Sequence, residues 1–152
     1  MRRFVSVMVA LLLLIPSTIF NTLAAENASK TDVIYLENGC YISVEITGID
    51  LREAGRKIGH KDYIYYNSDG EEQWRATLTG SFTYTGTSAT CTSSSCSVAI
   101  SDSNWSIVSK TADRSGNSAL ATVVMEKKFA GVKIYNREVS IMLTCDENGN
   151  LS

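Results

Sequence analysis

Apolar and polar residues alternate along the stretch QWRATLTGSFTYT, which runs from Gln73 to Thr85. Its even-numbered positions carry Trp74, Ala76, Leu78, Gly80, Phe82 and Tyr84. Its odd-numbered positions all carry charged, amide or hydroxyl side chains. Because successive side chains of a strand point to opposite faces of a sheet, the pattern predicts a long strand with one face on a core and one in water. Such strands are typical of antiparallel sheets.

Shorter segments with strand character recur along the rest of the chain. The segment from Cys40 to Ile46 alternates clearly, and the segment from His60 to Tyr66 is rich in tyrosine, which favours strands. Further strands are predicted at 96–100, from Trp105 onward, at 119–129 and at 133–145. The compact turn sequences NSDG, TGTS, SDSN, DRSGN and FAGV lie between the predicted strands. The charged link 50–59 is interpreted as a surface loop.

About seven strands with short links therefore make up the predicted domain, and no segment shows a helical period. This number of strands, joined by short links, predicts an all-β fold, an antiparallel β-sandwich that is immunoglobulin-like in strand number. In such a fold two inner faces share one core while the outer, threonine-rich faces meet solvent. A small β-barrel is the alternative arrangement of the same strands.

The start of the chain has the layout of a secretory signal peptide. Arg2 and Arg3 form a basic head, an apolar run follows from Val5 to Ile15, and small residues lead to Ala25. A retained membrane anchor is the alternative, although the apolar run is shorter than the roughly 20 residues that a spanning helix needs. We therefore expect a signal peptide at 1–25, a disordered lead at 26–31 and one secreted domain at 32–152, located outside the cell.

The charge balance excludes one class of partner. The full chain has 14 Lys and Arg against 16 Asp and Glu, a formal net charge of −2. Loss of Arg2 and Arg3 with the signal peptide would make the mature chain more acidic. Because nucleic acids are bound by basic faces, we expect no nucleic-acid partner. No second long apolar run follows the signal, so we also expect no membrane span in the mature chain.

All 4 cysteines lie in the predicted mature part, and exported thiols are usually paired. Cys40, Cys96 and Cys145 fall on the apolar faces of their predicted strands, whereas Cys91 and Cys96 would point to opposite faces of one unbroken strand. One possible framework has Cys91–Cys96 and Cys40–Cys145 bridges. The crossed framework has Cys91–Cys145 and Cys40–Cys96 bridges. Zinc is not expected, because Cys40 and Cys145 lack the close partner of a typical site.

No residue pattern predicts catalysis. His60 is the only histidine, and no nucleophile motif accompanies it. Carboxylates cluster in NSDGEE at 67–72 and in DENGN at 146–150, and oxygen-bearing side chains there alternate as in the first half of a calcium loop. Neither segment continues to the distal glutamate of such a loop, so both are interpreted as solvated turns. We predict a protein that is not an enzyme and has no metal or cofactor.

The tyrosines are the candidate binding residues. Tyr63 and Tyr65 share one face of their predicted strand, and Ile64 and Tyr66 share the other, so at least one pair is expected to face solvent. Exposed tyrosines on a sheet can stack on sugars or anchor a protein partner. The candidate binding set is therefore Tyr63, Tyr65 and Tyr66. The alternative is that these rings sit at the margin of the core with their hydroxyls in water.

Three segments carry a resemblance to a known group of proteins. They are FTYTGTSATCT from Phe82, SKTADRSGNSALA from Ser109 and VSIMLTCDENGNLS from Val139. These segments resemble small secreted bacterial β-domain proteins of uncharacterised function. The resemblance implies an exported β domain, implies no activity, and favours the crossed framework because Cys91 and Cys145 both lie within the resembling segments. Cys40 would then pair with Cys96.

The sequence thus predicts a small secreted, disulfide-stabilised protein with a non-catalytic role in extracellular binding. A cell-surface polymer or protein is the expected class of partner. A structural protein associated with the cell envelope and a secreted toxin or bacteriocin-like antagonist are the alternatives.

Overall fold

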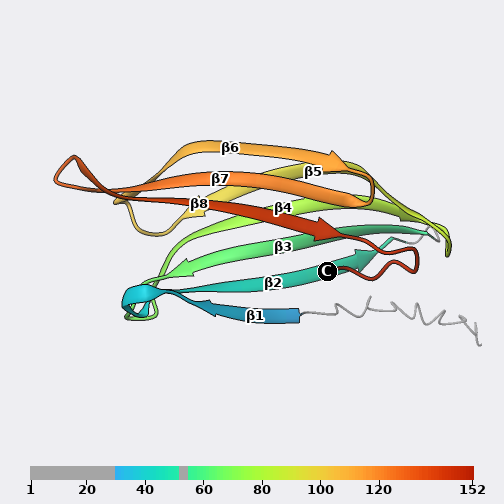
Figure 1. Cartoon of the computed structure of the whole chain (residues 1–152), viewed down its shortest axis with the longest axis horizontal. Helices are drawn as coiled ribbons and strands as arrows, with labels where there is room; N and C mark the ends of the chain where they lie inside the picture. The colour runs from blue at the N-terminus through green and yellow to red at the C-terminus, as the bar shows by residue number, and fades with distance from the viewer. Residues whose placement is uncertain (1–29, 52–54) are drawn as a thin grey trace, which may run out of the picture.

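A computed structural model describes residues 30–51 and 55–152, which form an antiparallel β-sandwich (Figure 1). The predicted signal peptide and most of the predicted lead lie outside the described residues. The strands are β1 (Lys30–Tyr35), β2 (Tyr41–Asp50), β3 (Arg56–Tyr66), β4 (Glu72–Tyr84), β5 (Ala89–Ile100), β6 (Trp105–Ser115), β7 (Ser118–Phe129) and β8 (Val132–Thr144), and a short 3-10 turn, η1 (Glu37–Gly39), follows β1.

The strands form two sheets in which every hydrogen-bonded neighbour is also the next strand in sequence. One sheet has 5 strands in the order β1 to β5, and the other has 3 strands in the order β6 to β8. The link after β5 carries the chain from one sheet to the other, and the sheets do not close into a barrel. The predicted sandwich is confirmed. Within the described residues, no helix is long and apolar enough to cross a membrane.

The first strand was absent from the prediction. β1 pairs with β2 from Lys30 onward, so two residues assigned to the disordered lead belong to a strand. All 6 of its residues are exposed, and its sequence KTDVIY has no buried face that would impose alternation. The predicted loop at 50–59 is also shorter than expected. Asp50 pairs with Lys57 across the hairpin, and the Lys57 Nζ lies 3.1 Å from Asp50 Oδ1.

The core lies between the two sheets. Trp74, Ala76 and Leu78 of β4 have 0% exposure, as the alternation in the sequence predicts. β4 contacts β7 and β8 across the sandwich, where alternate residues such as Val123 and Leu143 are equally buried. The sheets therefore bury the faces that the sequence identifies as apolar.

Three glycines lie side by side across the inner face of the larger sheet. Gly48 of β2 pairs with Gly59 of β3, and Gly59 pairs with Gly80 of β4. A Cβ atom at Gly59 would lie 2.7 Å from Leu151 Cδ1, and one at Gly80 would lie 2.6 Å from the Phe82 ring. The glycines therefore make room for the C-terminal segment and for a core ring.

All 4 cysteines are free thiols in this structure, so neither predicted disulfide framework is present. Strand register also rules out three of the pairings that the sequence left open. Cys91 and Cys96 lie opposite Phe82 and Leu78, which places them roughly 13 Å apart along β5, beyond the reach of a disulfide. Cys40 precedes β2 and Cys96 lies in β5, so three strand spacings, roughly 14 Å, separate them even before their offset along the strands.

Cys40 and Cys145 lie at opposite ends of the larger sheet. Cys145 lies near Asp50, the last residue of β2, and near Lys57, the partner of Asp50 in β3. Cys40 directly precedes the first residue of β2, and the length of this strand separates the two cysteines by roughly 33 Å. Cys91 and Cys145, in contrast, are neighbours. The Cys91 N–H donates to the carbonyl of Gly116 at 2.8 Å, and the Cys145 N–H donates to the carbonyl of Asn117 at 3.1 Å.

Candidate functional site

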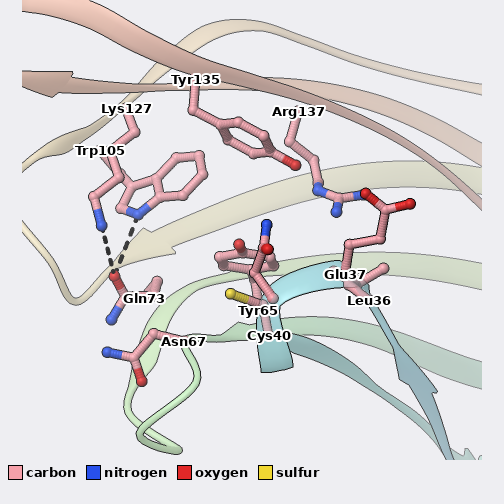
Figure 2. A pocket seen from close by; sticks show the side chains of 11 residues that line it. Leu36, Glu37, Cys40, Tyr65, Asn67, Gln73, Trp105, Lys127, Tyr135 and Arg137 are labelled. Atoms are coloured by element: carbon pink, nitrogen blue, oxygen red, sulfur yellow. Dashed lines mark hydrogen bonds between the residues drawn. The ribbon is translucent and has the colours of Figure 1, made fainter.

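A pocket of about 400 Å³ opens between the two sheets where β3 ends and β4 begins (Figure 2). Three parts of the fold line it. The segment around η1 contributes Leu36, Glu37, Asn38 and Cys40, the larger sheet contributes Tyr65, Asn67 and Gln73, and the smaller sheet contributes Trp105, Lys127, Tyr135 and Arg137. The pocket therefore combines aromatic rings, two cations, amides and one carboxylate.

An aromatic cluster forms one wall of the pocket and continues into the core. Tyr65 stacks on Trp74 with a centroid distance of 5.4 Å and an interplanar angle of 9°. Trp105 meets both rings edge-on, at 5.4 Å from Tyr65 and 6.1 Å from Trp74. Tyr135 in turn meets Trp105 edge-on at 6.0 Å and is 42% exposed. The cluster thus offers one accessible ring on a support that the core holds in place.

Arg137 projects from β8 beside these rings. Its guanidinium carbon lies 5.7 Å from the ring centroid of Tyr65 and 5.8 Å from that of Tyr135, within the range of cation–π attraction. The Arg137 Nε is buried and has no hydrogen-bond partner among residues 30–51 and 55–152. Figure 2 shows the guanidinium directed toward the rim that carries Glu37. The half-buried guanidinium of Arg137 is thus in contact with two tyrosine rings, and its Nε–H donor forms no hydrogen bond with them.

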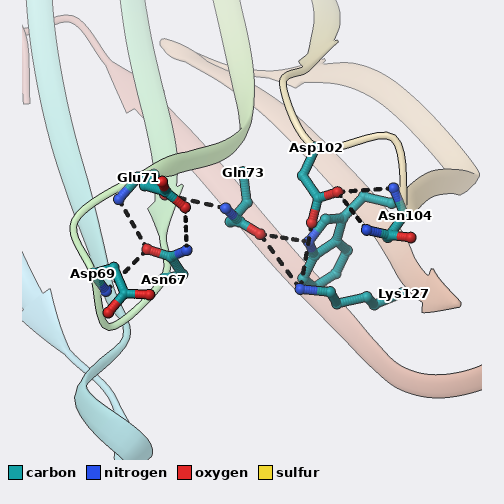
Figure 3. Close-up of polar contacts among 8 residues, drawn as sticks. Asn67, Asp69, Glu71, Gln73, Asp102, Asn104 and Lys127 are labelled. Carbon is teal, nitrogen blue, oxygen red and sulfur yellow. Dashed lines mark hydrogen bonds and ion pairs between the residues drawn. The ribbon is translucent and has the colours of Figure 1, made fainter. Parts of the chain in front are cut away.

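Lys127, the other cation, is held by polar partners (Figure 3). Its Nζ donates to Gln73 Oε1 at 3.4 Å and lies 3.4 Å from Asp102 Oδ2. The same Gln73 oxygen accepts from the Trp105 Nε1 at 3.4 Å. Hydrogen bonds from Asn104, together with Lys127, hold the pKa of Asp102 below its usual value. The charge of Lys127 is therefore largely compensated. Arg137 is the cation of the pocket that still has a hydrogen-bond donor without a partner among the described residues.

The Tyr65 hydroxyl stays protonated at the floor of the pocket. Burial raises the pKa of Tyr65 well above its usual value, and a hydrogen bond with the Cys40 thiol raises that pKa further. Tyr65 can therefore supply a neutral hydroxyl group to a ligand at any physiological pH.

The structure does not bring the three predicted tyrosines together. Tyr65 is buried at the pocket, and Tyr63 packs against the core from the same face. Tyr66 lies on the outer face, where it stacks on Tyr41 at 4.7 Å. Tyr35, which is 80% exposed, adds a third ring 6.1 Å from Tyr41. The outer tyrosines and the pocket are therefore separate surfaces.

Sequence reasoning missed the residues of β8 that reach the pocket, although a signal was present. Tyr135 and Arg137 are in phase with Val139, Ile141 and Leu143, which all face the core. An arginine at a position where the period demands an apolar residue is an anomaly. That anomaly identifies Arg137 as a candidate.

The remaining candidates from the sequence have local partners. The His60 Nδ1 lies 2.9 Å from the Thr79 hydroxyl on the outer face. The Asn67 side-chain oxygen accepts from the backbone N–H groups of Asp69 and Glu71 (Figure 3). Asp146 accepts from the N–H groups of Asn148 and Asn150 in the same way. Each calcium-like motif uses these oxygens to close its own turn.

Three comparisons with known proteins found no match. No protein-family model, no curated protein and no solved structure matches the chain.

Proposed function

We propose that this protein is a non-catalytic extracellular binding protein whose pocket takes an acidic sugar residue of a cell-surface polysaccharide. The observation that carries the proposal is Arg137, a half-buried cation held by two rings at the pocket with an unsatisfied Nε. Within residues 30–51 and 55–152 no ion pair involves Arg137, and contact with two rings replaces only part of the hydration that a half-buried charge loses. A carboxylate bound in the pocket would supply the missing partner and could accept two parallel hydrogen bonds from the guanidinium.

The other lining groups favour a sugar over a simple inorganic anion. The exposed ring of Tyr135 offers a face on which an apolar sugar face can stack. Glu37 can accept hydrogen bonds from sugar hydroxyls, while Asn38 and Asn67 can both donate and accept them. The volume of about 400 Å³ lies within the usual range for small-molecule sites.

The proposal includes export and one disulfide. The layout of residues 1–25 supports export. The neighbouring, buried positions of Cys91 and Cys145 support a bridge between these two residues in an oxidising compartment. Cys40 and Cys96 are then unpaired thiols within the chain.

Titration calorimetry with a polyuronate and with a neutral glucan tests the proposal. We expect the wild-type protein to bind the polyuronate and Arg137→Met to bind it at least about tenfold more weakly, because the substitution keeps the unbranched stem as far as the position of Nε and removes the charged guanidinium group. Arg137→Lys should restore part of the affinity. Lys110→Met removes an exposed cation from β6 and serves as the matched control, with no expected change.

Two results would count against the proposal. Equal affinity for the neutral glucan would remove the role of the acidic group. Unchanged affinity of Arg137→Met for the polyuronate, with an unchanged melting temperature, would place the binding site elsewhere.

A further inference from the structure

The hairpin that joins β7 to β8 ends in exposed apolar side chains. Phe129, Val132 and Ile134 are 70%, 65% and 58% exposed, and we refer to these three residues as the apolar tip. Figure 1 shows that this hairpin extends beyond the rest of the sandwich at one end of the molecule. Single exposed apolar residues are common on protein surfaces, but here three lie within six residues at the end of one hairpin, and two of them, Phe129 and Val132, are direct cross-strand partners.

The tip is built as a rigid, narrow projection. Phe129 pairs directly with Val132, so only Ala130 and Gly131 lie between the strands, with φ angles of 48° and 80°. Positive φ at both central residues is the conformation of a type I′ turn, one of the two favoured connections in two-residue hairpins. Because cross-strand partners project from the same face, the ring of Phe129 and the methyl groups of Val132 lie side by side.

The rest of the fold does not support the tip. The Lys128 N–H donates to the carbonyl of Asn104 at 2.8 Å, which ties the hairpin to the link between β5 and β6. Beyond Lys128, the described residues outside the hairpin form no backbone hydrogen bond with it. The apolar tip therefore gains nothing from burial within the molecule.

Basic residues stand directly behind the apolar tip. Lys128 pairs with Lys133 across the hairpin, one step back from the turn. Like charges at directly opposed positions are unfavourable on an isolated sheet. Glu126 compensates one of them, with its Oε1 at 2.6 Å from the Lys128 Nζ. Lys133 forms no ion pair within the described residues.

We infer that the hairpin tip is a membrane-attachment site that inserts Phe129, Val132 and Ile134 among the acyl chains of an anionic lipid surface. Lys128 and Lys133 have long apolar stems, so their ammonium groups can reach lipid phosphates while the tip lies deeper. This arrangement satisfies the two requirements of interfacial binding, which are apolar area to bury and positive charge at the level of the headgroups. The inference is independent of the proposed ligand of the pocket.

Vesicle flotation with the full chain tests the inference, using phosphatidylcholine alone and an equal mixture with phosphatidylglycerol. We expect binding to the mixed vesicles, and a loss of at least about tenfold in the double variant Phe129→Ser/Val132→Ser, which removes most of the insertable area. Lys128→Gln/Lys133→Gln should weaken binding to the mixed vesicles by about fivefold for each lysine removed. Ile107→Ser/Val108→Ser, an exposed apolar pair on β6, is the matched control and should change nothing.

A probe at the tip separates this contact from any other contact with lipid. The apolar run from Val5 to Ile15 is present in every variant, so differences between variants report on the tip. Phe129→Trp places an indole there, whereas the native Trp74 and Trp105 are buried. We expect its emission to shift to shorter wavelength on mixed vesicles and to be quenched by brominated acyl chains.

Specific results would overturn the inference. Unchanged flotation of Phe129→Ser/Val132→Ser, or an indole at position 129 that stays fully accessible to aqueous quenchers on vesicles, would exclude insertion. A wild-type dimer in analytical ultracentrifugation that the double variant abolishes, without vesicle binding, would assign the tip to a second copy of the chain. Arg137→Met should leave flotation unchanged, so failure of the pocket proposal and failure of this one are distinguishable.

Discussion

At the scale of single residues, the same periodicity that identifies the core also exposes an exception to it. Position 137 belongs to the inner face of β8, yet it carries an arginine whose contacts are two tyrosine rings. Strand phase predicts the face of a side chain, but it cannot predict which side chains of other strands lie opposite. The meeting of Arg137 with Tyr65 depends on how the two sheets stack, and that arrangement has no local signature in the sequence.

The buried environment of Trp74, unlike that of Arg137, can be predicted from the alternation in the sequence. Its side chain is completely buried and stacks on Tyr65. We expect Trp74→Ala to lower the free energy of unfolding by roughly 3 to 5 kcal/mol, since the substitution removes a large buried ring and leaves a cavity. Urea denaturation followed by circular dichroism measures this change.

Tyr35→Ala is the control for that measurement. This ring is almost fully exposed, so its removal should change the free energy of unfolding by no more than about 0.5 kcal/mol. If Trp74→Ala and Tyr35→Ala lowered the free energy of unfolding by similar amounts, burial of the Trp74 side chain would not be the main source of its contribution to stability.

At the scale of elements, the accuracy of the prediction follows the contrast between the two faces of each strand. β4 and the second half of β8 have one buried and one solvated face, and their alternation locates them correctly. β1 has no buried residue, so nothing in its sequence distinguishes it from a polar lead. β6 is exposed along nearly its whole length, and only its first residue, Trp105, gives a clear signal.

The row of glycines between β2 and β4 yields a prediction at this scale. A Cβ atom at Gly80 would lie 2.6 Å from the Phe82 ring and 3.0 Å from the Ala119 Cβ, which is attached directly to the facing strand. We expect Gly80→Ala to lower the free energy of unfolding by about 1 to 3 kcal/mol, because neither neighbour can move without shifting the sheets. Thermal and urea unfolding both report this change.

Gly59→Ala is the matched comparison within the same row. Its nearest neighbour would be the end of the Leu151 side chain, which can rotate away. The expected loss is therefore smaller than that of Gly80→Ala. A larger loss at position 59 would mean that the C-terminal segment is fixed more firmly than the packing between the two sheets.

At the scale of the whole molecule, the two ends of the sandwich are held in different ways. The pocket end is held by the aromatic cluster, which spans both sheets through Trp74 and Trp105. The opposite end brings Cys91 of β5 close to Cys145, which follows β8. A bridge between these two residues would link the sheets covalently at the end that lacks the cluster.

This arrangement predicts the state of the cysteines after oxidation of the protein. Peptide mapping without reduction should recover Cys91 joined to Cys145, with Cys40 and Cys96 alkylated as free thiols, because strand register keeps the latter two far apart. Cys145→Ser should lower the free energy of unfolding by roughly 2 to 4 kcal/mol, since the bridge restricts the unfolded chain. Cys96→Ser should have no comparable effect. Polyuronate binding should survive the loss of the bridge, because the pocket is at the other end of β4. In the peptide mapping, recovery of a peptide that joins Cys40 to Cys96 would contradict the observed strand register.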